Sequence, residues 1–203
     1  MHGSTIHYSM RCNRWINSCM PDDIKKYIKL IERSERAELS VYVPRYSIPY
    51  GLSPITSSTT LDIHYNKLYK GYVDKYNKGI NIGTNKAGAY LHEKWFEQFK
   101  PRRQVNRPTG RILDLVNRHY GDMKTFKDAL VEECQKVYGS GWVYVNRNMK
   151  IKQIRNHRIP PDGIIIIVDM WEHAWVRDYG SNKKQYVQNL WKLFDWPTIN
   201  ART

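Results

Sequence analysis

The sequence predicts an α+β fold, in which helices come first, a few short strands follow and helical sequence then resumes. Two observations predict it. Apolar residues recur at helical spacing between residues 60 and 135, whereas residues 142–171 contain three short runs rich in β-branched and aromatic residues. From residue 169 to Trp196 the spacing is helical again, and we expect one long final helix there.

The composition is that of a strongly basic protein with enough apolar material for a core. Among 203 residues, 33 Lys and Arg stand against 19 Asp and Glu, which gives a formal net charge of +14, and 41% of the residues are hydrophobic. An aromatic content of 13% excludes a wholly disordered chain. No apolar run approaches the roughly 20 residues that span a bilayer, so we expect no membrane partner.

The three cysteines, Cys12, Cys19 and Cys134, have no CxxC spacing. An odd number in this arrangement argues against a disulfide scaffold and against a thiolate zinc site. A reducing compartment is the setting that this pattern indicates.

Residues 1–42 are expected to form an extension to the main domain. Residues 1–20 contain two arginines and no acid, and we expect them to form an arm that lies on the domain or on a partner. The sequence PDD followed by IKKYIKLIERSERAEL predicts a helix with acids in its first turn. Residues 43–58 contain three prolines and a glycine, so they are expected to be extended and turn-like.

Two helices of the main domain each place a histidine on an apolar face. In residues 60–78, Leu61, His64, Leu68 and Tyr72 follow spacings of three, four and four, which puts them on one side of a helix. Residues 86–99 repeat this arrangement with His92 on the inward face. Two further amphipathic segments, residues 107–122 and 123–141, end at or near glycines.

The three strand predictions are WVYVN, KIKQIRN and GIIIIVDMW, which turn-like or loop residues separate. Where the last strand passes into helix, Asp169 and His173 lie four residues apart. Together with His64 and His92 they offer three imidazoles and one carboxylate, a mixed set that suits a redox-active first-row metal. Each histidine by itself is more often a core or surface residue than a metal ligand, so the spacing alone leaves the metal site open.

From about Val43 to the C-terminus the chain resembles the iron/manganese superoxide dismutase family. The resemblance rests on PYGLSPITSSTTLDIHYNKLYKGYV, on GSGW after a helix and above all on DMWEHAWVRDY. It implies an N-terminal helical hairpin, residues 43–104, followed by an α/β domain with a small three-stranded antiparallel sheet, residues 105–203. Only nineteen residues separate Tyr72 from His92, fewer than in the family, so we expect a shortened connection in the hairpin. The resemblance also implies that one iron or manganese ion, with iron favoured, is bound by His64, His92, Asp169 and His173.

The resemblance extends to residues around the metal. Tyr72 matches the tyrosine that stands over the substrate approach, and Trp142 and Trp171 resemble the family's aromatic wall. Many members use a glutamine to contact the metal-bound solvent, but the position that can carry it here is Gly88. A branch of the family instead uses a histidine after the second strand, and His157 in IRNHR is the candidate for that histidine here. The resemblance then implies that Tyr72 and His157 organise proton delivery. The alternative is a surface histidine in a basic hairpin.

A dimer is also implied, because Glu172 and His173 match the family's contact in which the glutamate of one subunit hydrogen-bonds the ligating histidine of the other. Alternatively, Glu172 is an ordinary surface acid. Members of the family commonly carry a histidine and a tyrosine at the mouth of the active site, and these positions are Leu68 and Val176 here. The hydrogen bond between those two side chains is therefore absent from this chain.

Much of the positive charge lies in two acid-free runs, residues 100–111 and 136–158. They are consistent with a solvated basic surface, with steering of the superoxide anion, or with contacts to RNA phosphates. The candidate RNA contacts are Lys100, Arg102, Arg103, Arg107, Arg111, Arg147, Lys150, Lys152 and Arg155.

Two hypotheses about function follow. Superoxide-dismutase-like proteins of the mitochondrial small ribosomal subunit are an offshoot of the family, and this chain resembles them in its basic charge, N-terminal arm and altered gateway. The first hypothesis is a structural, metal-retaining subunit of that particle, paired with an identical or related chain and contacting ribosomal RNA and neighbouring ribosomal proteins. The second is a free, active superoxide dismutase that converts superoxide to dioxygen and hydrogen peroxide. Both place the protein in the mitochondrial matrix.

Overall fold

The computed structural model of the protein describes residues 21–26, 51–101 and 105–203. The chain divides into two units, Met1–Tyr42 and Val43–Thr203. In the first unit, residues 22–26 are helical, as the capped-helix pattern predicts. The predicted arm and the remainder of that helix lie outside the described residues, and the fold below is that of the second unit. The division of this unit into two domains, residues 43–104 and 105–203, stays a prediction.

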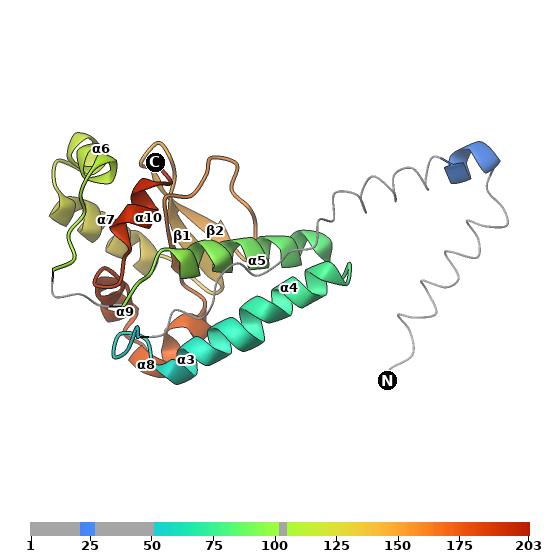
Figure 1. Ribbon diagram of the computed structural model, residues 1–203, viewed down its shortest axis with the longest axis horizontal. Helices are drawn as coiled ribbons and strands as arrows, with labels where there is room; N and C mark the ends of the chain where they lie inside the picture. Colours follow the sequence, from blue (N-terminus) through green and yellow to red (C-terminus); the bar gives the residue numbers. More distant parts are fainter. Residues whose placement is uncertain (1–20, 27–50, 102–104) are drawn as a thin grey trace. The chain divides into compact units, whose positions relative to one another are not determined.

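A helical hairpin opens the second unit (Figure 1). Its first arm is a continuous helical run made of α3 (Ser58–Asp62), a π-helical segment η1 (Ile63–Tyr69) and α4 (Lys70–Asn77). The side chain of Ser57 caps α3 by accepting a hydrogen bond from the Thr60 amide. After a turn of four residues, α5 (Ile82–Glu97) runs back beside α4, so the connection is short, as the sequence predicts.

The α+β fold class is confirmed by a sheet of three antiparallel strands in the order β2-β1-β3. The strands are β1 (Gly141–Val145), β2 (Ile151–Arg155) and β3 (Ile166–Asp169). Trp142 on β1 is paired with Ile154 on one side and with Asp169 on the other. Every residue of β1 and β3 is buried, whereas in the edge strand β2 only Ile154 is buried. The end of β3, with Asp169, therefore lies in the interior.

Helices α6 (Arg111–Tyr120) and α7 (Met123–Gln135) follow the hairpin, as the amphipathic spacing predicts. Phe126 and Leu130 of α7 have no exposed surface, and α7 contacts β1 and β2. α5 contacts β3, so the helix that carries His92 lies directly against the strand that carries Asp169.

The prediction of one long final helix is wrong. The structure instead has a 3₁₀ turn η2 (Glu172–Ala174) and three short helices, α8 (Val176–Tyr179), α9 (Lys183–Leu190) and α10 (Trp196–Asn200). Gly180 ends α8 with a positive φ of 58°, and the side chain of Asn182 then caps α9 by accepting a hydrogen bond from the Gln185 amide. These two residues separate α8 from α9, although the apolar spacing of the sequence continues through them. No described helix is long and apolar enough to cross a membrane.

Candidate metal centre

Four side chains from four elements meet in the interior of the second unit. His64 comes from η1, His92 from α5, Asp169 from the end of β3 and His173 from η2. One nitrogen or oxygen atom of each lies within 4.8 Å of the corresponding atom of every other. A π-helical segment is uncommon and often marks a functional site, and here it carries the first histidine.

The distances between these atoms suit a shared ion. The Nε2 atoms of His64, His92 and His173 lie 3.1, 3.8 and 3.2 Å from the same oxygen, Oδ2 of Asp169. Ligand atoms bonded to one metal at about 2.1 Å are separated from each other by roughly 3.0–3.6 Å. The four residues therefore have the spacing of a coordination shell.

The hydrogen-bonding pattern of His92 and His64 leaves ring nitrogens that can bind a metal ion between the four side chains. Nδ1 of His92 lies 2.7 Å from the carbonyl oxygen of Gly88, which can only accept, so Nδ1 carries the proton and Nε2 is a free acceptor. Nε2 of His92 and both ring nitrogens of His64 are buried and have no hydrogen-bond partner among the described residues. Buried polar atoms without a partner are costly, and binding of a metal ion would satisfy them.

Burial sets the charges of the site. It lowers the pKa of His64, and lowers the pKa of His92 well below its usual range, so both rings are neutral near pH 7. Burial alone would raise the pKa of Asp169, but His173 and His64 beside it hold that pKa below its usual range. Two neutral imidazoles beside an ionised carboxylate in a dry interior favour a bound cation.

Aromatic rings surround the centre and exclude water. The ring of Trp95 lies 4.5 Å from that of His64, and the ring of Trp142 lies 4.9 Å from that of His92. Trp171 stacks on His157 with centroids 4.6 Å apart and lies 5.8 Å from His173. Trp142 and Trp171 are thus beside the ligands, where the resemblance places them.

Three side chains next to the centre form a directed chain of hydrogen bonds. Nε1 of Trp142 can only donate, and it donates to Nδ1 of His157 at 3.2 Å. The proton of the neutral His157 ring is therefore on Nε2, which lies 2.8 Å from the hydroxyl oxygen of Tyr72 and donates to it. Burial lowers the pKa of His157 to about 4, and burial together with Asp169 raises the pKa of Tyr72. Near pH 7, the Tyr72 hydroxyl accepts from His157 and keeps its own proton for another acceptor.

Gly88 is the reason that Tyr72 can take this position. A Cβ atom on Gly88 would lie 2.7 Å from Cδ1 and 2.8 Å from Cγ of the Tyr72 ring, well inside van der Waals contact. The ring of Tyr72 therefore occupies the space that any side chain at position 88 would need. His157 reaches the same region from the loop after β2.

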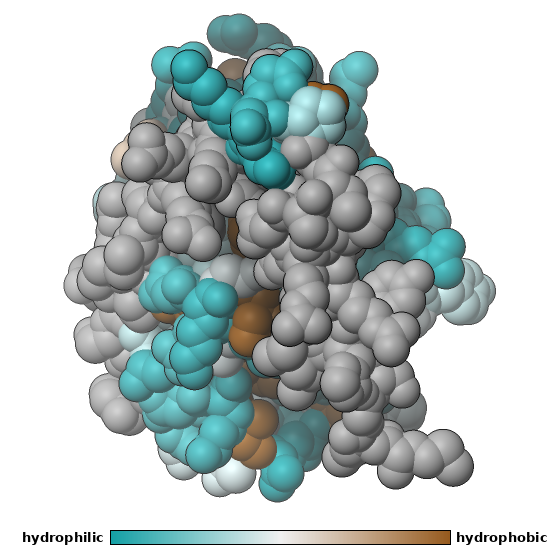
Figure 2. Space-filling view, turned by 90° about the vertical axis from the view of Figure 1, so that its right-hand side faces the viewer, coloured by the Kyte–Doolittle hydropathy of each residue, from teal (hydrophilic) through white to brown (hydrophobic). Residues whose placement is uncertain are grey.

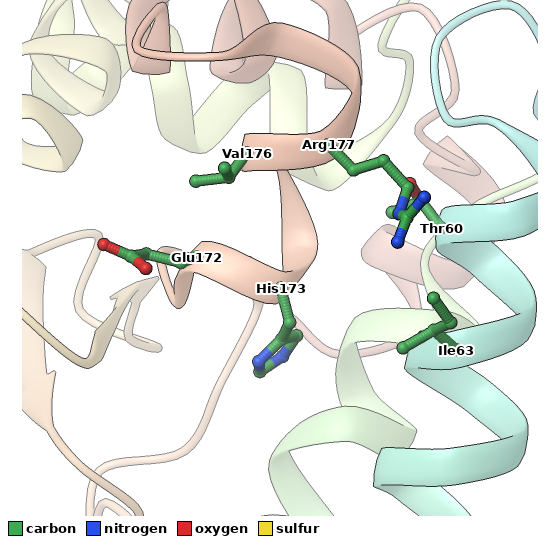
Figure 3. A pocket seen from close by; sticks show the side chains of 6 residues that line it. All are labelled: Thr60, Ile63, Glu172, His173, Val176 and Arg177. Atoms are coloured by element: carbon green, nitrogen blue, oxygen red, sulfur yellow. The ribbon is translucent and has the colours of Figure 1, made fainter.

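A surface pocket is lined by His173, one of the four converging residues (Figure 3). His173 is its link to the site, because its side chain is 18% exposed whereas those of His64, His92 and Asp169 are 0% exposed. Figure 3 shows the pocket between the Glu172–Arg177 segment and the helix that carries two of the lining residues. The lining residues are Thr60, Ile63, Glu172, His173, Val176 and Arg177.

The two basic runs do not form an acid-free surface in the fold. Lys100 pairs with Asp195 at 2.8 Å, and Lys152 pairs with Asp162 at 2.6 Å. Figure 2 shows one face on which the described surface is mainly hydrophilic, with smaller apolar areas between. Arg102 and Arg103 lie outside the described residues, and the other candidate RNA contacts are exposed: Arg107, Arg111, Arg147, Lys150 and Arg155.

Sequence reasoning missed two residues near the centre. The hydroxyl of Tyr186 donates to the carbonyl oxygen of Asp169 at 3.0 Å, and the side chain of Gln98 pairs with the main chain of Ile167 on the same strand. In the sequence, Tyr186 is on the apolar face of the final helical segment, which predicts only a core residue. Gln98 has no sequence signal, because its partners are main-chain atoms.

Comparisons with known proteins agree with this geometry. Residues 108–202 match the family described as iron/manganese superoxide dismutases, C-terminal domain. Asp169 and His173 lie within the matched segment, and His64 and His92 precede it.

Similar whole proteins extend the match to the hairpin. A superoxide dismutase [Mn/Fe] of Porphyromonas gingivalis is 29% identical, over 77% of this chain and 96% of its own length. A superoxide dismutase [Fe] of Bacteroides fragilis is 28% identical over 76% of the chain and 96% of its own length, and one of Pyrobaculum aerophilum is 26% identical over 80% and 93%. In its fold, in its four converging side chains and in these matches, the chain is similar to the iron/manganese superoxide dismutases.

The lowered pKa of His157 predicts a measurable pH dependence of stability. Between about pH 4 and the ordinary value of 6.5, the unfolded chain binds a proton that the folded chain does not, so stability falls as the pH falls through this window. His157→Gln keeps a donor and an acceptor but cannot titrate. We expect the metal-free variant to lose less stability than the wild type from pH 6.5 to 4, measured by urea unfolding. The exposed His119→Gln serves as control, and equal losses for His157→Gln and wild type would contradict the assignment.

The contact between Gly88 and Tyr72 predicts opposite effects of two glycine substitutions. Gly88→Ala forces the Tyr72 ring to move and should destabilise the protein by about 1–3 kcal/mol. Gly71→Ala, on α4, meets no atom within 4 Å and should stabilise the helix by up to about 1 kcal/mol. Chemical unfolding of both variants measures this difference, and a neutral Gly88→Ala would show that Tyr72 does not fill this space.

Proposed function

We propose that the protein is a superoxide dismutase that binds one iron or manganese ion through His64, His92, Asp169 and His173. The observation that carries the proposal is the convergence of three imidazoles and one carboxylate in a buried, aromatic-lined site. Two of the relatives described above are named as iron enzymes, and this supports iron as the expected metal.

An iron or manganese ion would supply one-electron redox chemistry, which is what the disproportionation of superoxide needs. Two superoxide anions and two protons give one dioxygen and one hydrogen peroxide, so one superoxide is oxidised and the other is reduced. The protein must therefore deliver two protons for each cycle. Because the ligand set is fixed, proton delivery is the part of the reaction that the remaining residues can control.

Tyr72 is the residue that we assign to proton donation into the site. Its hydroxyl oxygen accepts a hydrogen bond from His157, and this leaves the phenolic proton free to point at a reactant. The raised pKa of Tyr72 keeps that proton in place near pH 7. Trp142 fixes the tautomer of His157, so that His157 acts as a neutral donor and not as a titrating base.

We also propose that the protein is a dimer and that a second copy covers the pocket over His173. The pocket exposes a ligand histidine together with Val176, a valine that is 39% exposed. It also carries one acid, Glu172, and one base, Arg177, so a two-fold arrangement can bring opposite charges together. The assignment of Glu172 to the His173 of the partner subunit comes from the resemblance to the family.

The first of the two hypotheses from the sequence, a role in the mitochondrial small ribosomal subunit, has no support from the fold or from the relatives described above, which are named as superoxide dismutases. Its main argument was the density of positive charge, and two of its candidate contacts, Lys100 and Lys152, are engaged in ion pairs. The mitochondrial matrix stays a prediction of the sequence.

The ligand assignment predicts paired losses of metal and activity. His64→Ala should remove bound iron or manganese and reduce dismutase activity to background, because three donors remain and a cavity replaces the fourth. His119→Ala, on the exposed face of α6, should keep both. Elemental analysis and a superoxide consumption assay measure the two quantities on the same samples. A metal-loaded wild type without activity, or a His64→Ala variant with a full complement of metal, would contradict the proposal.

The dimer proposal predicts that a charge reversal in the pocket weakens association. Glu172→Lys places a second positive charge beside Arg177 and removes the acceptor for the histidine of the partner subunit, so the dimer dissociation constant should rise at least about tenfold. Glu132→Lys, on an exposed part of α7, is the control. Analytical ultracentrifugation at several concentrations measures the constant. A monomeric wild type, or equal dissociation constants for the two variants, would refute the interface.

A further inference from the structure

The buried amide of Gln98 is paired with the main chain of one residue of β3. Gln98 immediately follows α5, and its side chain has no exposed surface. Its Nε2 donates to the carbonyl oxygen of Ile167, and its Oε1 accepts from the Ile167 amide at 3.0 Å. The side chain thus occupies both main-chain hydrogen-bonding groups of Ile167, which a neighbouring strand could otherwise use.

This pair joins the two elements that carry His92 and Asp169. Gln98 lies six residues after His92, and Ile167 lies two residues before Asp169. The Nε2 atom of His92 and the Oδ2 atom of Asp169 are 3.8 Å apart, and both residues are fully buried. A change in the separation of α5 and β3 near Gln98 is therefore transmitted to the spacing of two ligands.

Arg202 joins α5 to the start of β3 at a second point. Its Nη2 donates to the carbonyl oxygen of Lys94 at 2.9 Å and pairs with Oε2 of Glu97 at 2.8 Å. Its Nη1 donates to the carbonyl oxygen of Ile165, which directly precedes β3. Burial alone would raise the pKa of Glu97, but Lys94 and Arg202 hold it below its usual range, so the pair stays charged near pH 7.

We infer that Gln98 is a positioning residue of the metal centre, which holds α5 against β3 at the separation where His92 and Asp169 can share one ion. The inference rests on the proposed function, because it presupposes that the four residues bind metal. Groups that orient metal ligands typically change metal affinity by about 10- to 100-fold when they are removed. Gln98 acts through the two elements, because its hydrogen bonds are to Ile167 and not to a ligand side chain.

The test compares Gln98→Leu with wild type and with Asn106→Leu. Gln98→Leu keeps the approximate size and removes both hydrogen bonds to Ile167. Asn106 is a matched control, because its amide donates to the carbonyl oxygens of Trp191, Lys192 and Phe194, away from the metal ligands. Each metal-free protein is titrated with Co²⁺ at a temperature where circular dichroism shows it to be folded, and the visible absorption bands report coordination geometry.

We expect Gln98→Leu to bind Co²⁺ at least about tenfold more weakly, with shifted absorption bands, and Asn106→Leu to match the wild type in both. If Gln98→Leu does not fold, Gln98→Glu replaces it; the ionised side chain can accept from Ile167 but cannot donate, and the same changes are expected. Wild-type affinity and bands in the Gln98 variant would overturn the inference and leave the proposed function intact. A wild type that binds no Co²⁺ would overturn both.

Discussion

A carboxylate with no exposed surface lies at the end of β3, and a buried charge of this kind is stable only when the groups around it compensate for lost water. The main-chain amide of Trp171 donates to one oxygen of Asp169, and three imidazole nitrogens surround the other. The other elements of the fold place the remaining groups around this carboxylate. The hairpin brings two imidazoles to the carboxylate, β1 and α5 cover the strand that ends in it, and the 3₁₀ turn brings the third imidazole back.

The sequence carried enough information to predict most of this arrangement. Apolar spacing predicted that His64 and His92 face inward, because a helix repeats its face every three or four residues. The spacing of Asp169 and His173 at a change from strand to helix placed the other two ligands near each other. Periodicity along the chain cannot predict that all four side chains meet, because their meeting depends on the tertiary structure. The prediction that they meet came from the family resemblance.

The parts that the sequence did not predict have identifiable causes. The final helical segment is broken between α8 and α9 because Gly180 ends the first helix and Asn182 caps the second, while the apolar spacing continues. Gln98 pairs with main-chain atoms, and any strand offers such atoms whatever its sequence. The charge pattern of the sequence is incomplete for a related reason: residues 100–111 and 136–158 contain no acid in sequence, yet Asp195 and Asp162 pair with Lys100 and Lys152 in space.

The contact between Gly88 and Tyr72 limits which residues position 88 can hold. Because the ring of Tyr72 fills the space beside Gly88, a side chain cannot be introduced there by a single substitution without displacing the ring. His157, on a distant part of the sequence, contacts the same tyrosine. In this chain a side chain at position 88 would therefore have to displace the ring of Tyr72, and with it the hydroxyl group that His157 contacts.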